Sequence, residues 1–291
     1  MTRPIGRREF LRVCAAVSAA LAPAVVVAQE PKRPRLRKAV KYGMIQLRGS
    51  HKDKLDLARR CGFAGVEIDS PGTQNLDDLV AASKETGVVI HGVIDSVHWT
   101  DTLSHADAAV RARGLAALTG ALEDARKVGA TTVLLVPGVV NRDVTFDQCW
   151  ERSAAEVRKA LPLAEKLGVK IAIEVVWNNF ITTPEQLIRY VDQFRNDHVA
   201  AYFDCSNMIK YGVAPAEWIR RLGRRMVKFD FKGYSKTKEW VPIGDGDEDW
   251  PEVLKALGEV GYDGWATAEV QGGGEDVLRR ISAQMDRVLG L

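Results

Sequence analysis

Residues 170–204 read KIAIEVVWNNFITTPEQLIRYVDQFRNDHVAAYFD, and this stretch decides the fold. Two short apolar runs, Lys170–Val175 and Ala200–Asp204, have the length and composition of buried strands. Between them Pro184–Phe194 is amphipathic, and the Thr183-Pro184 pair is typical of a helix start. The stretch therefore predicts one strand–helix–strand unit of a parallel sheet.

The same alternation continues on both sides of this unit. Further strands are predicted at Tyr42–Leu47, Gly65–Asp69, Val88–Ile94, Thr132–Val136, Met226–Lys232 and Trp265–Glu269. Further helices are predicted at Leu76–Thr86, Ala106–Val128, Cys149–Leu167, Pro215–Leu222, Trp250–Val260 and Glu275–Leu289. Eight strands alternating with helices over about 250 residues are typical of an α/β fold with a single (β/α)8 TIM barrel, here residues 39–291. A doubly wound sheet is disfavoured, because no glycine-rich phosphate turn follows the first predicted strand.

The N-terminal segment has the composition of a leader. Arg7 and Arg8 precede a Phe-Leu pair and a mildly apolar stretch, and Val26-Val27-Ala28 offers small residues for cleavage. Residues 1–28 thus resemble a twin-arginine signal peptide, which implies an exported, periplasmic protein with no membrane attachment after cleavage. An ordinary amphipathic leader or a membrane anchor is the alternative. Residues 29–38 are polar and broken by prolines, so we expect a linker there.

The charge distribution bears on the partners. The whole chain has a formal net charge of +3, but from residue 39 onward 36 acidic residues outnumber 32 basic ones. A nucleic-acid partner is not expected, because phosphate binding requires a basic excess on the folded domain. After the leader only Cys61, Cys149 and Cys205 remain, and three scattered cysteines do not form a disulfide framework. The sequence is compatible with a homo-oligomer and does not decide the matter.

Four consecutive predicted strands end in or close to a carboxylate. Since side chains alternate between the two faces of a strand, the apolar neighbours of each acid belong on the outer face and the acid inside the barrel. All four are then expected at the mouth, where a hard divalent cation would neutralise them: Glu174, Asp204, Asp230 and Glu269. For a single such acid, a helix cap or a surface ion pair would be the simpler interpretation.

Several motifs are similar to those of the xylose-isomerase-like barrels, a group of sugar isomerases and epimerases that shares its fold with endonuclease IV. The likeness covers residues 39–290 and is greatest to the L-xylulose-5-phosphate 3-epimerase and hexulose-phosphate isomerase group. It rests on residues 136–140, 150–153, 174–180, 202–207, 217–220 and 244–251.

The resemblance implies a metal held by Glu174, Asp204, Asp230 and Glu269. The family has histidine where this chain has Asp230, so the all-oxygen set favours Mn²⁺, with Mg²⁺ or Ca²⁺ as alternatives, over zinc. The two glutamates, Glu174 and Glu269, both bind the metal and exchange the proton in the family, and they lie on opposite sides of the expected mouth. This makes them the predicted catalytic base and acid.

Other residues are candidates around this centre. Lys232 shares the inward face with Asp230, so it is predicted either to stabilise charge on a substrate oxygen or to form a structural ion pair. Carbohydrate sites combine aromatic rings with amides and charged groups. On this basis the predicted substrate-binding residues are Glu67, His91, His98, Trp99, Trp177, Asn178 and Asn207. Each of them, taken singly, is equally compatible with core or loop packing.

The sequence favours a metal-dependent isomerase or epimerase acting on a non-phosphorylated carbohydrate or keto-sugar. Export argues against a phosphorylated substrate, because such metabolites are mainly cytosolic. Two alternatives stay open: a lyase or hydratase on 3-keto-glycosides, and a non-catalytic sugar-binding barrel. An abasic-site endonuclease is disfavoured by the small number of histidines, five, and by the absence of a basic excess.

Overall fold

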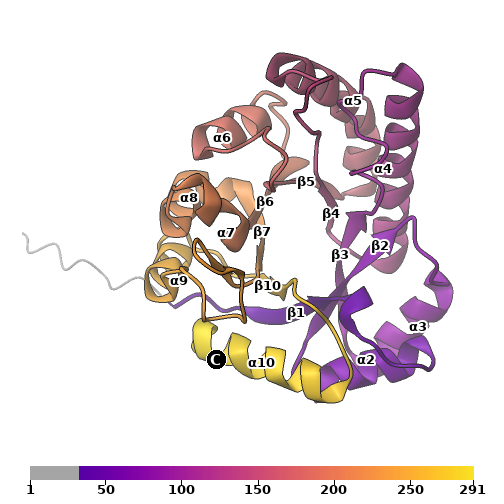
Figure 1. Ribbon diagram of the computed structural model, residues 1–291. Coiled ribbons are helices and arrows are strands. Elements are labelled where there is room, and N and C mark those ends of the chain that lie inside the picture. The colour runs from indigo at the N-terminus through magenta and orange to yellow at the C-terminus, as the bar shows by residue number, and fades with distance from the viewer. Residues whose placement is uncertain (1–32) are drawn as a thin grey trace, which may run out of the picture. The chain divides into compact units, whose positions relative to one another are not determined.

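Eight parallel strands close into a barrel in the computed structural model, which describes residues 33–291 (Figure 1). Around the barrel the neighbour order is β1-β10-β7-β6-β5-β4-β3-β2, as a single (β/α)8 barrel requires. The strands are β1 Arg37–Lys41, β2 Gly65–Ser70, β3 Val89–Asp95, β4 Thr132–Leu135, β5 Lys170–Glu174, β6 Val199–Asp204, β7 Met226–Phe231 and β10 Trp265–Ala268. The predicted fold class is confirmed. The predicted signal peptide, residues 1–28, lies outside the described residues.

Helices surround the strands on all sides (Figure 1). They are α2 His51–Arg60, α3 Leu76–Thr86, α4 Ala108–Val128, α5 Phe146–Leu167, α6 Pro184–Asp192, α7 Cys205–Met208, α8 Pro215–Leu222, α9 Trp250–Glu259 and α10 Glu275–Leu289. Local signals set their ends. The hydroxyl of Thr183 accepts a hydrogen bond from the Gln186 amide at the start of α6, and Gly87 ends α3 in the left-handed conformation.

The prediction of the first strand at Tyr42–Leu47 is wrong. The strand is Arg37–Lys41, and Tyr42–Met44 form a short 3₁₀ helix after it. The strand therefore begins inside the segment 29–38 that was predicted to be a linker. Three of its five residues are basic, so it lacks the apolar run that marks a buried strand. Its charges are accommodated within the fold: the Arg37 guanidinium lies 4.0 Å from the Trp265 ring centroid, and Lys41 points into the barrel.

The barrel is apolar outside and largely polar inside. Outward-facing residues such as Ile173 and Phe203 are fully buried beneath the helices, and the Phe203 ring stacks on Trp218 of α8 at 5.5 Å. Inside, a small apolar cluster of Leu134, Ala172 and Tyr202 forms one layer. The remaining interior space holds charged and hydroxyl side chains, and these carry the functional argument.

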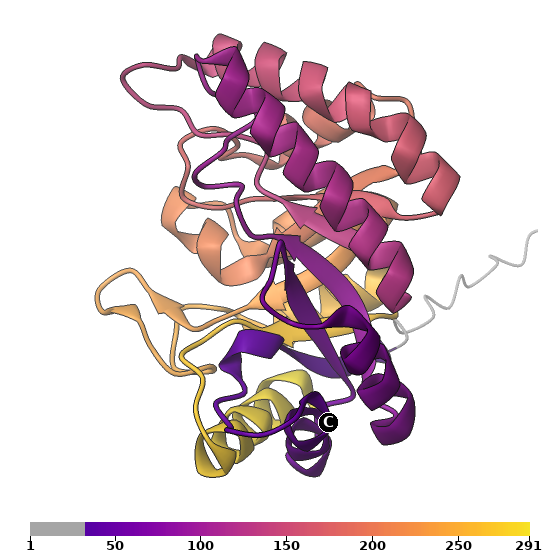
Figure 2. The ribbon, with the colours of Figure 1, turned by 90° about the vertical axis from the view of Figure 1, so that its right-hand side faces the viewer.

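The longest connections follow the carboxyl ends of the strands, on one side of the barrel (Figure 2). The connection after β7 contains a two-stranded antiparallel ribbon, β8 Tyr234–Ser235 and β9 Glu239–Trp240. Active sites of this fold lie on that side. No helix within residues 33–291 is long and apolar enough to cross a membrane.

Candidate functional site

Three carboxylates meet at the mouth of the barrel. Glu174 ends β5, Asp204 ends β6, and Glu269 follows β10 directly. Each offers an oxygen, and the three oxygens lie within 4.8 Å of one another. Glu174 and Asp204 are buried, whereas the Glu269 side chain is 41% exposed. Three of the four predicted ligands are therefore brought together.

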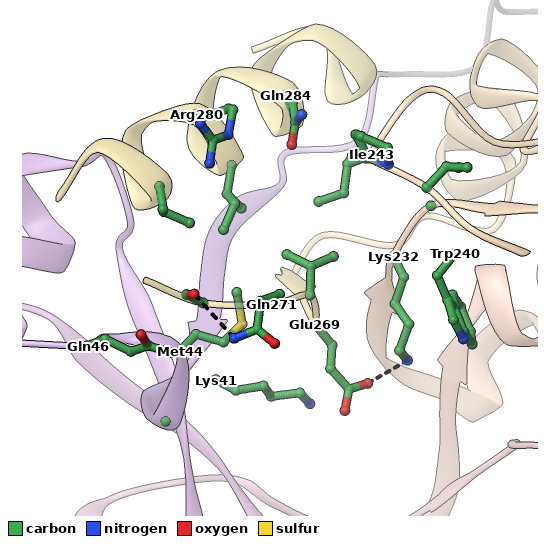
Figure 3. A pocket seen from close by; sticks show the side chains of 18 of the residues that line it. Lys41, Met44, Gln46, Lys232, Trp240, Ile243, Glu269, Gln271, Arg280 and Gln284 are labelled. Atoms are coloured by element: carbon green, nitrogen blue, oxygen red, sulfur yellow. Dashed lines mark hydrogen bonds and ion pairs between the residues drawn. The ribbon is translucent and has the colours of Figure 1, made fainter. Parts of the chain in front are cut away.

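The Lys232 ammonium lies between two of these carboxylates. Its Nζ donates to Asp204 Oδ2 at 2.5 Å. It also donates to Glu269 Oε2 at 2.6 Å (Figure 3). Burial opposes the charge of Lys232, but the neighbouring carboxylates raise its pKa above the ordinary value. Burial likewise acts against the charge of Glu269, but Lys232 and Lys41 lower its pKa overall. Both groups are therefore charged at neutral pH.

Glu174 has a different environment. Burial and the repulsion of Glu269 raise the pKa of Glu174 well above its ordinary value. No side chain within residues 33–291 donates a hydrogen bond to its carboxyl group. A buried carboxyl group without a donor is costly unless a ligand satisfies it, so Glu174 is available to a bound group.

Asp230 differs from the prediction, because it does not join the three carboxylates. Its carboxylate accepts a hydrogen bond from Tyr202 Oη at 2.5 Å and lies 2.6 Å from the Lys41 ammonium. Asp230 and Lys232 share one strand face, but two residues correspond to about 6–7 Å along the strand. Lys232 consequently reaches the mouth, while Asp230 lies one layer below it. Burial raises the pKa of Asp230 to about 7 although Lys41 acts to lower it.

Glu67 and His91 were predicted to bind substrate, but both lie in the layer below the mouth. Glu67 accepts hydrogen bonds from Lys41 Nζ at 2.6 Å and from Tyr202 Oη at 2.7 Å. The His91 ring stacks on Trp265 at 4.4 Å, and its Nδ1 lies 2.8 Å from Lys228 Nζ. Burial and the Lys228 charge lower the pKa of His91 well below its usual range. Both residues thus support the floor of the site from below.

A cavity of about 260 Å³ opens above the carboxylates. Among the predicted residues, its wall contains His98, Trp99, Trp177, Asn207, Glu174, Glu269 and Lys232. Burial lowers the pKa of His98 to about 4, so its imidazole is neutral at physiological pH. Trp177 donates from Nε1 to the Asn207 carbonyl at 2.7 Å, which fixes its indole. Asn178 is not part of this wall. Its side chain instead donates to the Gly138 carbonyl at 2.8 Å and orders the loop.

Three residues of the site were missed. Lys41 lies in the floor of the cavity and was missed because the first strand was misplaced. Tyr202 lies two residues before Asp204 and therefore points inward by simple alternation, so the sequence did contain a signal for it. Trp240 of β9 stacks on Trp177 with 4.9 Å between ring centroids, a contact that depends on the path of the ribbon.

The three carboxylates suit a hard divalent cation. The donors are all oxygens, their spacing permits a shared ion, and the Glu174 carboxyl group has no other partner within the described residues. Lys232 occupies part of the same space, so its ammonium group has to move when an ion binds.

A second cavity of about 880 Å³ adjoins the first. The two share part of their walls, namely Lys41, Ile94, Lys232, Trp240 and Glu269. Glu269 projects between the two ammonium groups at this boundary (Figure 3). A molecule bound at the carboxylates can therefore extend into the larger cavity.

Known proteins resemble the chain in sequence and in fold. L-ribulose-5-phosphate 3-epimerase UlaE of Escherichia coli O1:K1 / APEC is 26% identical over 227 residues, which is 73% of this chain and 79% of that protein. The structure of the IolI protein with a bound zinc atom superposes with a TM-score of 0.75 at 18% identity, covering 88% of this chain and 98% of that one. D-psicose 3-epimerase from Clostridium cellulolyticum H10, solved with D-tagatose, superposes with a TM-score of 0.72 at 20% identity, covering 87% and 98%.

The family assignment rests on a longer match. Residues 55–287 match the family described as xylose isomerase-like TIM barrel. The matched region includes the strands that carry Glu174, Asp204 and Glu269, and it runs from α2 into α10. The chain therefore belongs to the xylose isomerase-like TIM barrel family, whose relatives described above include sugar epimerases.

Proposed function

We propose that the protein is a divalent-metal-dependent sugar epimerase or isomerase that moves a proton next to the carbonyl of a non-phosphorylated keto-sugar. The observation that carries this proposal is the cluster of Glu174, Asp204 and Glu269 around Lys232, beside a cavity that Glu174, Glu269 and Lys232 line. The sugar-epimerase relatives and the zinc atom in the IolI structure support both the reaction class and the metal. The all-oxygen donor set suits Mn²⁺, Mg²⁺ or Ca²⁺ better than zinc, and we take Mn²⁺ as the ion to test.

The metal would be held by Glu174, Asp204 and Glu269. When bound, a divalent cation stabilises the negative charge that develops on a carbonyl oxygen during proton removal. Glu174 and Glu269 come from β5 and from the end of β10, so they approach the cavity from different sides. This placement suits them to take a proton from one face of the substrate and return it to the other.

Lys232 and the aromatic side chains complete the site. Once its ammonium leaves Asp204 and Glu269, Lys232 can donate a hydrogen bond to a substrate oxygen without leaving the cavity wall. Trp177 and Trp240 offer indole surface at the wall, which suits the C–H face of a sugar. His98 is neutral at physiological pH and can orient a hydroxyl group.

The charges of the cavity favour a non-phosphorylated substrate. Lys41 is engaged with Glu67 and Asp230 inside the barrel, so it is not free to bind a phosphate, and Lys232 is assigned to a substrate oxygen beside Asp204 and Glu269. Within residues 33–291, Arg280 is the one cation lining either cavity that has no ion pair. The twin-arginine leader, residues 1–28, agrees with this preference, because it would place the mature protein in the periplasm.

The test is proton exchange in D₂O. Protein loaded with Mn²⁺ is incubated with a panel of keto-sugars, and we expect deuterium at the carbon next to the ketone. Glu174→Gln and Glu269→Gln should each lower turnover about 100-fold or more, the usual contribution of a general acid or base. Glu275→Gln, an exposed glutamate on α10, is the control and should keep full activity. The proposal is wrong if no deuterium enters and both site variants also keep full activity.

Elimination from a 3-keto-glycoside is the second candidate, and the adjoining 880 Å³ cavity favours it because a glycosidic group fits there. It begins with the same proton removal. Product analysis separates the two reactions: epimerisation keeps the glycosidic bond, whereas elimination releases the attached group.

A further inference from the structure

The larger cavity shares Glu269 and Lys232 with the carboxylate cluster, but most of its wall comes from other parts of the chain. Its walls come from the segment after β1, from residues 240–243 at the end of the ribbon and after it, from residues 269–272 after β10, and from α10 (Figure 3). At about 880 Å³ it is more than three times the size of the cavity above the carboxylates, which measures about 260 Å³. Its volume lies in the upper part of the range for small-molecule sites. One keto-sugar ring at the carboxylates would leave it unfilled.

Polar side chains converge on this cavity without partners of their own. Within residues 33–291, the side chains of Gln46, Arg280 and Gln284 make no hydrogen bond and no ion pair. Gln271 makes one long contact, 3.5 Å to the Gly272 carbonyl. Arg280 and Gln284 extend from α10 toward the cavity, and Gln46 and Gln271 lie across from them (Figure 3). Four groups able to donate hydrogen bonds therefore surround one space.

Apolar surface lies between these polar groups. Met44, Ile243 and Val277 line the cavity, and the Trp240 indole stands at the boundary with the carboxylates. Amide groups suit the hydroxyls of a sugar, and aliphatic or aromatic surface suits its C–H faces. A phosphate in this cavity would need more positive charge, because Arg280 is one guanidinium, Lys41 is paired with Glu67 and Asp230, and Lys232 faces the carboxylate cluster.

We propose that the larger cavity is a subsite for a second sugar ring, so that the substrate is a keto-disaccharide or another keto-glycoside. This inference rests on the proposed function and narrows its substrate class. The keto ring occupies the cavity at Glu174 and Glu269, and the glycosidic bond passes between Trp240 and Lys41 at the shared boundary. The second ring then meets Gln46, Arg280 and Gln284.

Binding measurements test the subsite without requiring turnover. Calorimetry with 3-ketolactose and with methyl 3-ketoglucoside gives the dissociation constants of a two-ring and a one-ring ligand. We expect 3-ketolactose to bind at least tenfold more tightly. Gln284→Trp should fill the cavity from α10, raise the dissociation constant of 3-ketolactose at least tenfold and leave that of the one-ring ligand within twofold. Gln46→Trp should do the same from the opposite wall.

Ala283→Trp is the matched control, because Ala283 is the exposed neighbour of Gln284 on α10 and does not line the cavity. It should change neither constant. The subsite is refuted if both tryptophan variants leave the binding of 3-ketolactose unchanged or weaken both ligands equally. It is also refuted if L-ribulose 5-phosphate binds more tightly than 3-ketolactose and loses that affinity in Arg280→Gln, since the cavity would then be a phosphate site.

The two proposals can fail separately. Tight binding of 3-ketolactose that Gln284→Trp abolishes, with no deuterium exchange on any keto-sugar, supports the subsite and contradicts the proposed function. Deuterium exchange on one-ring keto-sugars, with no preference for the two-ring ligand, supports the function and contradicts the subsite.

Discussion

Replacing Lys232 by methionine tests how much the positive charge of Lys232 stabilises the carboxylate cluster. Methionine matches the length of the side chain but removes the ammonium that now lies against Asp204 and Glu269. Breaking a buried ion pair by removing one partner costs about 3–5 kcal/mol. Here Asp204 is fully buried, but it keeps hydrogen bonds from the Ser206 and Asn207 amides, and Glu269 is 41% exposed.

We therefore expect Lys232→Met to lower the free energy of unfolding by about 3 kcal/mol, the lower end of the range for breaking a buried ion pair. A loss of 1 kcal/mol lowers the melting temperature of a domain of this size by about 2–4 °C, so Lys232→Met should melt about 6–12 °C below the wild type in EDTA. Saturating Mn²⁺ should remove most of this difference, because the ion restores positive charge to the cluster. The dissociation constant of Mn²⁺ should fall about tenfold or more, since no ammonium competes for the same oxygens.

The assays are thermal melts with EDTA and with Mn²⁺, and a Mn²⁺ titration followed by electron paramagnetic resonance. Lys255→Met is the control, because Lys255 pairs with Glu252 at 3.2 Å on the exposed surface. That pair should be worth less than about 1 kcal/mol. The reasoning is refuted if Lys232→Met melts within about 2 °C of the wild type in EDTA and binds Mn²⁺ no more tightly.

Three further predictions concern Asp95, Asp230 and the N-terminal segment. Burial raises the pKa of Asp95 to about 7, so its charge destabilises the fold as the pH rises from about 4 through 7. In urea melts, the free energy of unfolding of Asp95→Asn should equal that of the wild type at pH 3.5 and exceed it by about 2–4 kcal/mol at pH 8. An equal difference at both pH values would contradict this. Asp230→Asn should leave Mn²⁺ affinity within twofold, because Asp230 pairs with Lys41 and Tyr202 below the three carboxylates, and a tenfold loss of affinity would make Asp230 a ligand after all. N-terminal sequencing of protein from the native host should find Gln29 at the start of the mature chain, and an uncleaved cytosolic chain would exclude the export signal.

The carboxylates could be predicted from the sequence because their positions follow from local rules. Each lies at the end of an apolar strand, and alternation places it inside the barrel. Glu174, Asp204 and Glu269 needed only these rules and the order of the strands. The same rules put Asp230 on the correct face but could not give its depth. That depth depends on Tyr202 and Lys41, which reach Asp230 from two other strands.

Lys41 could not be found in this way. Three of the five residues of strand β1 are charged, and Lys41 becomes a buried residue only because Glu67 and Asp230 face it inside the barrel. Glu67 and Asp230 lie 26 and 189 positions further along the chain, so no local sequence pattern predicts that they pair with Lys41. The cavity beside α10 could not be predicted from a local pattern either, because residues far apart in the sequence, from 41–46 and from 232–284, form its wall.

The ribbon after β7 has a consequence for how this protein can change. Residues 233–243 supply Trp240 and Ile243 to the cavity walls, but none of the three carboxylates. The proposed acid–base groups, Glu174 and Glu269, lie at strand ends, whereas part of the wall of the proposed second-ring subsite belongs to the connection between β7 and α9. Replacing this connection by that of a relative would be expected to change the substrate preference to that of the relative and to leave the acid–base chemistry unchanged. On the proposed function, different segments of this chain would thus determine the reaction and the substrate preference.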